Sequence, residues 1–201
     1  MLPLLIVLAF TVFLLLSNYF LRKNSHSEED KQKAFWDLEN RANATRKKDI
    51  SKLDYIQIPY DTFPIGKYSD AKVTAIEQEL LSLKDLPILN LGTQTNTELK
   101  LTYGIANLEI LSTCDDRFAT LAKLLVSYAQ ALIEAGHPAD AICVLRFGID
   151  CKTDIVSNYT TLAELYQAGN QTDQIKNLYS AAEALDSPRK SVILEKLKSN
   201  L

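Results

Sequence analysis

An unbroken apolar run occupies residues 2–21 and contains no charged side chain. Its only polar residues are Thr11, Ser17 and Asn18. A helix of about 20 residues rises about 30 Å, which is the thickness of the hydrocarbon core of a bilayer. Because such a helix satisfies its backbone hydrogen bonds internally, lipid can surround it. The pattern predicts a transmembrane anchor, with the lipid bilayer as the first partner of this chain.

Two other interpretations of this run stay open. A cleaved signal peptide would need a basic residue before the apolar run, a shorter core and a small-x-small cleavage site. Residues 17–21 make a poor site of that kind. A buried core helix would normally carry more polar residues along one face. We therefore expect an anchor.

The charges that follow the apolar run predict its orientation. Arg22 and Lys23 come directly after it. Since the cytoplasmic flanks of membrane spans carry the excess of Lys and Arg, we expect the body of the protein to lie in the cytoplasm. An extracytoplasmic body behind an uncleaved signal anchor is the alternative.

Residues 22–48 predict a charged juxtamembrane helix. Acidic residues gather near its start and basic residues at its end, an order that complements the helix dipole. Its apolar content is thin, and its largest apolar side chains are Phe35, Trp36 and Leu38. A solvated stalk is the favoured interpretation. Contact of Trp36 with lipid or with a partner is the alternative.

Residues 49–66 change in character and predict an extended strap. Pro59 and Pro64 exclude a helix, and the aromatic and β-branched residues around them favour an extended course. So many apolar side chains in one loop would be exposed if nothing covered them. We therefore expect the strap to lie on the helical body.

From residue 67 to residue 201 the apolar positions recur with helical spacing. Gly136 and Gly169 are placed to end helices, and Ser69 and either Asp115 or Asp116 to begin them. The expected helices cover residues 70–83, 98–112, 115–135, 138–149, 154–168, 172–185 and 188–201. The chain is therefore predicted to be all-α.

From about residue 121, this helical domain repeats itself at an offset of about 33 residues. At that offset Gly136 pairs with Gly169, and Leu145 pairs with Leu178. The period and the pattern resemble the tetratricopeptide repeat (TPR), which is a pair of antiparallel helices. The resemblance implies TPR-like α-α hairpin repeats behind the transmembrane helix and the strap.

The chain departs from the TPR pattern at several positions. Ala129 and Ala141 match small packing residues in the first unit, but Leu162 and Gln174 stand at the corresponding places of the second. The usual tryptophan is missing, and the closing proline is missing or shifted. The whole layout of anchor, charged helix, strap and repeats also resembles bacterial single-pass membrane proteins, which implies no particular activity.

The TPR resemblance implies a concave groove lined by the first helix of each hairpin, which suits a protein or peptide partner. The implied groove residues are Lys123, Val126, Gln130, Ile133, Glu134, Val156, Tyr159, Ala163, Tyr166 and Gln167. Tyr159 and Tyr166 are the favoured contacts, because aromatic residues dominate binding energy at interfaces. The alternative is that both tyrosines pack against the strap, so that the chain fills its own groove.

Charge and side-chain chemistry narrow the function further. The net charge is −3, and residues 22–52 carry a positive excess of about 3, so the rest of the chain is acidic. An acidic body argues against binding to nucleic acid. His26 and His137 are isolated, and the three cysteines are too irregularly spaced for a zinc site. We expect no metal, no cofactor and no catalytic site.

The leading hypothesis is a membrane-anchored scaffold or adaptor that binds an unidentified protein or peptide. One alternative is a structural or assembly subunit of a membrane complex, in which the anchor itself makes contacts. Another is an extracytoplasmic chaperone-like repeat protein. All three share the repeat body, and they differ in what the anchor contacts and in which side of the membrane the body faces.

Overall fold

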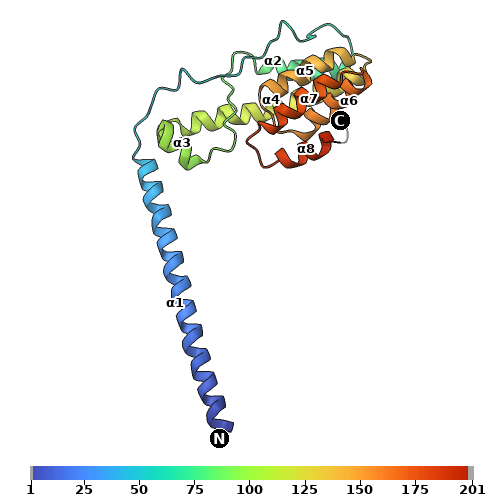
Figure 1. The fold of residues 1–201 in the computed structure, drawn as a ribbon. Helices are drawn as coiled ribbons and strands as arrows, with labels where there is room; N and C mark the ends of the chain where they lie inside the picture. The colour runs from blue at the N-terminus through green and yellow to red at the C-terminus, as the bar shows by residue number, and fades with distance from the viewer. Residues whose placement is uncertain (1, 199–201) are drawn as a thin grey trace. The chain divides into compact units, whose positions relative to one another are not determined.

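The computed structural model of the chain describes residues 2–198, without the side chains of residues 2–9, 15, 18 and 20–27. Within the described residues the regular structure is helical and includes no strand (Figure 1). The prediction of an all-α fold is confirmed.

The chain forms two compact units. The first unit consists of the chain up to Asp49 together with Thr95–Leu108. The second consists of Ile50–Gln94 together with the chain from Glu109 onward. Each unit therefore combines segments that are distant in the sequence.

Helix α1 (Leu2–Asn43) belongs to the first unit and is continuous, so the predicted anchor and the juxtamembrane helix are parts of one element. It ends at Asn43 rather than at the expected Lys48. Among the described residues, no helix is both long and apolar enough to cross a membrane. The side chains of residues 2–9, 15, 18, 20 and 21 of the predicted anchor lie outside the described residues. The anchor stays a prediction.

The C-terminal part of α1 packs on α3 (Asn96–Tyr103). The hydroxyl and backbone of Thr95 form a capping box with Glu98 at the start of α3. Lys100 Nζ donates a hydrogen bond to Glu39 Oε2 at 2.8 Å, and this bond is the main cause that lowers the pKa of Glu39. The end of α1 is thereby attached to α3 by a salt bridge.

Gly104 interrupts the helix that was expected over residues 98–112. Its φ is 88°, and a Cβ atom at this position would lie 2.4 Å from the backbone oxygen of Arg46. Only glycine accepts both the left-handed backbone and this close approach. A short 3₁₀ helix, η1 (Ile105–Asn107), follows instead of a continuing α-helix. The expectation of one helix in this region is therefore wrong.

Helix α4 (Leu108–Glu134) begins well before its expected start at Asp115 or Asp116. Asp115 lies inside the helix, where its Oδ1 accepts a hydrogen bond from the backbone N–H of Leu91 at 3.0 Å. The carboxylate that was expected to cap a helix therefore holds a loop against α4.

The strap contains no helix and no strand. Phe63 is buried, and its ring lies edge-to-face against Phe147 with 5.5 Å between the centroids. The backbone N–H of Ile56 donates to the carbonyl of Ile88 at 2.9 Å. These contacts attach the strap to α5 and to the loop that contains Ile88.

Helix α2 (Ala71–Ser82) follows the strap. Its cap is Asp70, whose Oδ1 accepts hydrogen bonds from the backbone N–H groups of Lys72 and Val73 at 2.9 and 3.0 Å. The expected cap, Ser69, is one residue too early. A carboxylate next to a helix N-terminus also interacts favourably with the helix dipole.

Shorter helices complete the described part of the second unit: α5 (Pro138–Asp150), α6 (Val156–Ala168), α7 (Thr172–Glu183) and α8 (Lys190–Lys198). Helix α6 packs against α5, α7 and α8, and α7 also packs against α8. Their apolar side chains join those of α2, α4 and the strap in one hydrophobic core.

The two hairpins of the second unit repeat at an offset that is one residue longer than the sequence pattern predicted. Helix α4 ends at Glu134 and α5 begins at Pro138. Helix α6 ends at Ala168 and α7 begins at Thr172, and each lies one residue beyond the position that the predicted offset gives. We call the number of residues from Glu134 to Ala168 along the chain the observed offset.

The conformations of the two turns follow the observed offset. The left-handed residue is Gly136 (φ 85°) in the first turn and Asn170 (φ 54°) in the second, whereas Gly169 has a φ of −86°. The pairing of Gly136 with Gly169 is therefore wrong by one residue.

Backbone hydrogen bonds support the same register. The N–H of His137 donates to the carbonyl of Leu132 at 2.7 Å in the first turn, and the N–H of Gln171 donates to that of Tyr166 at 2.8 Å in the second. Both turns are Schellman motifs, which require a left-handed residue just after the helix. Asparagine takes this conformation less often than glycine, so Asn170 is the weaker sequence signal.

Small buried residues also coincide in this register. Ala129 corresponds to Ala163, and Gly148 corresponds to Ala182, and all four are buried. Leu162 stood at a small-residue position only because the predicted offset was one residue short. One of the two departures from the repeat pattern in the core is thereby removed.

Candidate functional site

The groove residues expected on α4 lie at the surface of the second unit. All are exposed or half-buried: Lys123, Val126, Gln130, Ile133 and Glu134. Lys72 Nζ donates to Glu134 Oε2 at 2.6 Å, and Gln130 Nε2 donates to Glu134 Oε1 at 3.1 Å. The hydrogen bond from Lys72 is the larger cause and that from Gln130 the second cause of the lowered pKa of Glu134. Helix α2 therefore borders this end of the α4 surface.

The groove residues expected on α6 are divided between surface and core. Gln167 is exposed and Val156 is half-buried, but Tyr159 is 0% and Tyr166 is 4% exposed, and Ala163 is buried too. The hydroxyl of Tyr159 donates to the carbonyl of Thr153 at 3.0 Å, and burial raises the pKa of Tyr159 to about 12. The structure thus places both favoured tyrosines in the core, where a partner cannot touch them while the protein is folded.

The one-residue error in the repeat explains this outcome. One residue turns an α-helix by about 100°, which exchanges surface positions for core positions. At the observed offset, the α6 counterparts of the α4 positions are Ser157, Thr160, Glu164, Gln167 and Ala168. All of them are exposed except Thr160, which is half-buried. The signal that could have found this set is the asparagine at position 170, read as the left-handed residue of the turn.

A buried carboxylate connects the strap to α2 and α4. Glu77 is 4% exposed, and its Oε2 accepts from the backbone N–H of Gly66 at 3.0 Å. Its Oε1 accepts from the hydroxyl of Tyr128 at 2.8 Å. Burial, followed by the hydrogen bond to Glu77, raises the pKa of Tyr128. The pair attaches the exposed end of the strap, Gly66, to a buried carboxylate.

A second polar cluster holds the residues that follow the strap. The ring of Tyr68 stacks on that of His137 with 3.5 Å between the centroids, and its hydroxyl donates to Asp140. Lys67 Nζ lies 2.8 Å from Asp140 Oδ2. The hydrogen bonds from Lys67 and then from Tyr68 lower the pKa of Asp140. The strap is therefore attached to the first turn of α5.

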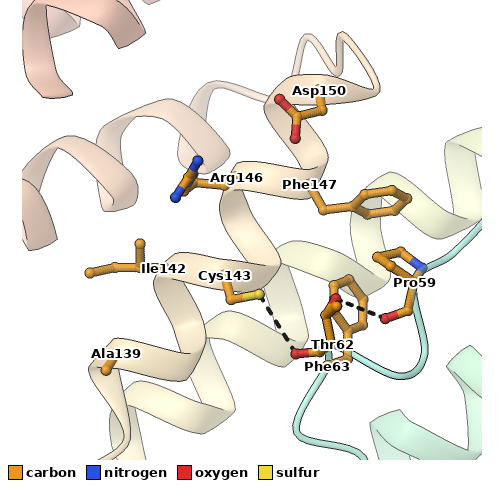
Figure 2. A pocket seen from close by; sticks show the side chains of 9 residues that line it. All are labelled: Pro59, Thr62, Phe63, Ala139, Ile142, Cys143, Arg146, Phe147 and Asp150. Carbon is orange, nitrogen blue, oxygen red and sulfur yellow. Dashed lines mark hydrogen bonds between the residues drawn. The ribbon is translucent and has the colours of Figure 1, made fainter.

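A pocket of about 320 Å³ lies between the strap and the outer side of α5 (Figure 2). Much of its lining is apolar: Pro59, Phe63, Ala139, Ile142 and Phe147. None of these residues was expected to form a site, because the pocket is built from segments far apart in the sequence. The prolines that predicted the strap were the sequence feature that came closest to indicating this pocket.

Polar groups complete the pocket. Arg146 and Asp150 lie one helical turn apart on α5, and both side chains are exposed. Within the described part of the chain, neither forms an ion pair. A basic residue four positions before an acidic one is the weaker order for an intrahelical pair. Cys143 Sγ faces the carbonyl oxygen of Thr62 at 3.8 Å (Figure 2).

Two cysteine thiols of the second unit have raised pKa values. Burial raises the pKa of the Cys114 thiol, and it raises that of Cys151 to about 12, so both remain protonated at neutral pH. In the region that the structure describes, no three His, Cys, Asp or Glu side chains are placed to hold a metal ion. That the protein is not an enzyme stays a prediction.

No protein family matches this sequence, and neither a curated protein nor a solved structure is significantly similar to it. The resemblance to the TPR accordingly stays a prediction. The function has to be argued from the geometry of the chain itself.

Proposed function

We propose that this chain is a single-pass, membrane-anchored scaffold or adaptor that binds a protein or peptide partner. Residues 2–21 supply the anchor, and the hairpins α4–α5 and α6–α7 supply the binding body. Arg22 and Lys23 favour a body in the cytoplasm. The proposal assigns no catalytic step.

The observation that carries the proposal is the exposure of α1. Large apolar residues in its first half leave between 47% and 62% of their surface uncovered: Phe10, Val12, Phe13, Leu14, Leu16 and Tyr19. At about 100° per residue, these side chains cover an arc of about 220° around the helix, and the rest of its circumference is occupied by other uncharged residues of the run 2–21. A helix that is apolar on all sides has no face for water, and lipid is the environment that suits it.

The spacing of the hairpins supports the binding role. Helix ends, turn conformations and small core residues recur at the observed offset. A TPR unit has the same length, about 34 residues. Lys190, the first residue of α8, follows Val156, the first residue of α6, at that offset too. Helix α8 thus stands where the first helix of a third unit would begin. Stacked hairpins of this kind present their first helices along one surface.

Extraction of membranes tests the anchor. Aspartate in place of Phe13 and Leu14 should prevent stable insertion, because each charge at the centre of a span costs about 2.5–3.5 kcal/mol. The native chain should resist alkaline extraction and the variant should be released, with Lys33→Glu as the control outside the apolar run. A variant that stays in the membrane would contradict the anchor. A reporter fused after Leu201 shows which side the body faces.

Site-specific cross-linking tests the binding role. A photoreactive residue in place of Gln130 or Glu164 should capture the same partner in native membranes, since both positions lie on the first-helix surface. The matched control is Glu183, which is exposed on α7. No captured partner at Gln130 or Glu164, with the protein folded, would exclude this surface as the binding site.

A structural subunit, held in a complex through α1, is the second candidate. Phe35 and Trp36 favour it, because they are 54% and 56% exposed and lie edge-to-face with 5.6 Å between their centroids. Trp36 is about 22 Å beyond Leu21 along the helix axis, outside the headgroup layer of a bilayer that residues 2–21 would span. Moving the body onto an unrelated anchor helix distinguishes the two, since retained function would exclude this candidate.

A further inference from the structure

We propose that the pocket between the strap and α5 binds a partner helix that carries a large apolar side chain beside an acidic and a basic residue one turn apart. The inference rests on the proposed function, because it assigns a surface and a partner chemistry to the same interaction module. The surface is distinct from the first-helix surface of α4 and α6.

The lining of the pocket explains the apolar side chain. Phe63 is 5% exposed and packs edge-to-face on Phe147. The two rings form one wall of the pocket, and both pack in the hydrophobic core. Ala139 and Ile142 of α5 also line the pocket. A volume of about 320 Å³ is larger than a single side chain. It therefore admits a phenylalanine or tryptophan together with neighbouring methylene groups.

The two charged residues of the pocket explain the charges of the partner. Arg146 and Asp150 are exposed, and neither is neutralised by an ion pair within the described residues. Four residues of an α-helix rise about 6 Å. A partner helix lying along α5 repeats that spacing with its own charged residues at positions i and i+4. Complementary charges in that arrangement fix the register of the partner.

The combination of groups favours a helix over other occupants. A helix presents residues i, i+3 and i+4 on one face, so an apolar side chain stands beside the two charges. In an extended peptide, the residues of one face follow one another in a line about 7 Å apart, so an apolar side chain stands beyond one of the two charges and not beside both. In a free amino acid, the amine and the carboxylate are separated by a single carbon atom, which is much less than one helical turn.

Binding of synthetic helical peptides to the full chain in lipid nanodiscs tests the proposal. Two probes carry phenylalanine at i+3 with glutamate and lysine at i and i+4, one in each order, and a third has alanine in place of phenylalanine. One charged order should bind and the alanine peptide should bind about tenfold more weakly. Ala139→Trp, which narrows the pocket, and Arg146→Glu, which reverses its charge, should each weaken binding about tenfold.

Matched variants make the result specific. Ala139 and Arg146 are exposed, so both substitutions should leave the fold intact. Glu164→Lys, on the first-helix surface of α6, should leave peptide binding unchanged. A peptide with glutamate and lysine exchanged should bind better to Arg146→Glu than to the native chain. Equal binding of all peptides, no binding of either charged order, or insensitivity to both pocket variants would overturn the proposal.

Two further outcomes separate this inference from the proposed function. Competition by free phenylalanine that Ala139→Trp abolishes would show a small-molecule site and overturn the partner helix. In native membranes, a photoreactive residue in place of Thr62 should capture the partner through a helix with the stated charges. Capture at Glu164 but not at Thr62 would support the proposed interaction module and exclude the pocket as a binding site. Capture at neither position would exclude both the interaction module and the pocket as binding sites.

Discussion

The turn between α4 and α5 and the turn between α6 and α7 have the same hydrogen bonds but different residues at the left-handed position. Gly136 occupies that position in the first turn and Asn170 in the second, while Gly169 has an ordinary φ of −86°. The comparison shows that these hairpins are aligned by backbone conformation. Matching glycine to glycine shifts the second hairpin by one residue and brings core tyrosines into the predicted binding surface.

Truncation of Tyr159 tests that register with the largest expected effect. The side chain is fully buried and hydrogen-bonded to Thr153, so Tyr159→Ala should lower the free energy of unfolding by about 3–5 kcal/mol. Glu164→Ala, on the exposed side of the same helix, should change it by less than about 0.5 kcal/mol. Chemical denaturation of the full chain measures both. Similar small effects would place Tyr159 at the surface and restore the shorter, predicted offset.

Gly148 and Ala182 occupy equivalent positions of the two hairpins, and both are buried. A Cβ atom at Gly148 would lie 2.5 Å from Asn158 Oδ1, in a side chain that is buried and donates to the carbonyl of Leu145 at 2.9 Å. Gly148→Ala should therefore destabilise the protein by about 2–3 kcal/mol. Ala182→Gly should cost about 1 kcal/mol, as in other helices.

A double variant provides the control for that clash. Removing the opposing side chain with Asn158→Ala should relieve part of the penalty, so the effects of Gly148→Ala and Asn158→Ala should sum to more than the effect of the pair. Thermal and chemical unfolding curves of the three variants give the comparison. Strict additivity would mean that the two side chains do not compete for the same space.

The two glycines of the turns should respond in opposite ways to alanine. Gly136→Ala forces a side chain into the left-handed region and should lower stability by about 1–2 kcal/mol. Gly169→Ala has ordinary backbone torsions and contacts no closer than 3.5 Å, so it should be neutral or stabilising by up to about 1 kcal/mol. Midpoints of thermal unfolding distinguish these results. Equal losses of stability in the two variants would indicate that Gly169 also has a left-handed backbone.

Acid should affect the first hairpin slightly more than the second. The pKa of Asp140 is lower in the folded protein than the value of about 3.9 in unfolded chains. Its contribution is therefore complete above about pH 4 and is lost as the pH falls through the lower folded value. Asp140→Asn should remove that dependence, with an effect below about 1 kcal/mol near neutral pH. Asp173→Asn on α7 is the control, and an equal change there would contradict a role for the strap cluster.

Local backbone chemistry made much of the fold predictable. Proline at position 138 and the period of the following apolar residues predicted a helix over 138–149, and α5 is Pro138–Asp150. Similar reasoning predicted 172–185 for α7, which is Thr172–Glu183. Both predictions succeed because helical period and helix-starting residues act within a few residues of where they stand.

Long-range contacts account for the misplaced helix ends. Aspartate is a common capping residue. The carboxylate of Asp115 instead accepts a hydrogen bond from the backbone N–H of Leu91, and α4 continues through this residue. Gly104 ends α3 because the backbone of Arg46 approaches it. A residue that has two possible roles in isolation receives one of them from a partner that is distant in the chain.

The sequence by itself determined the all-α class, the apolar run at residues 2–21 and the approximate limits of the last helices, because these depend on periodicity and on single-residue torsion preferences. The tertiary structure decided which face of α6 is buried and which residues of the strap and α5 enclose a pocket. The pocket depends on neighbours that are distant in the chain: Arg146 becomes a pocket residue only because the strap packs beside α5.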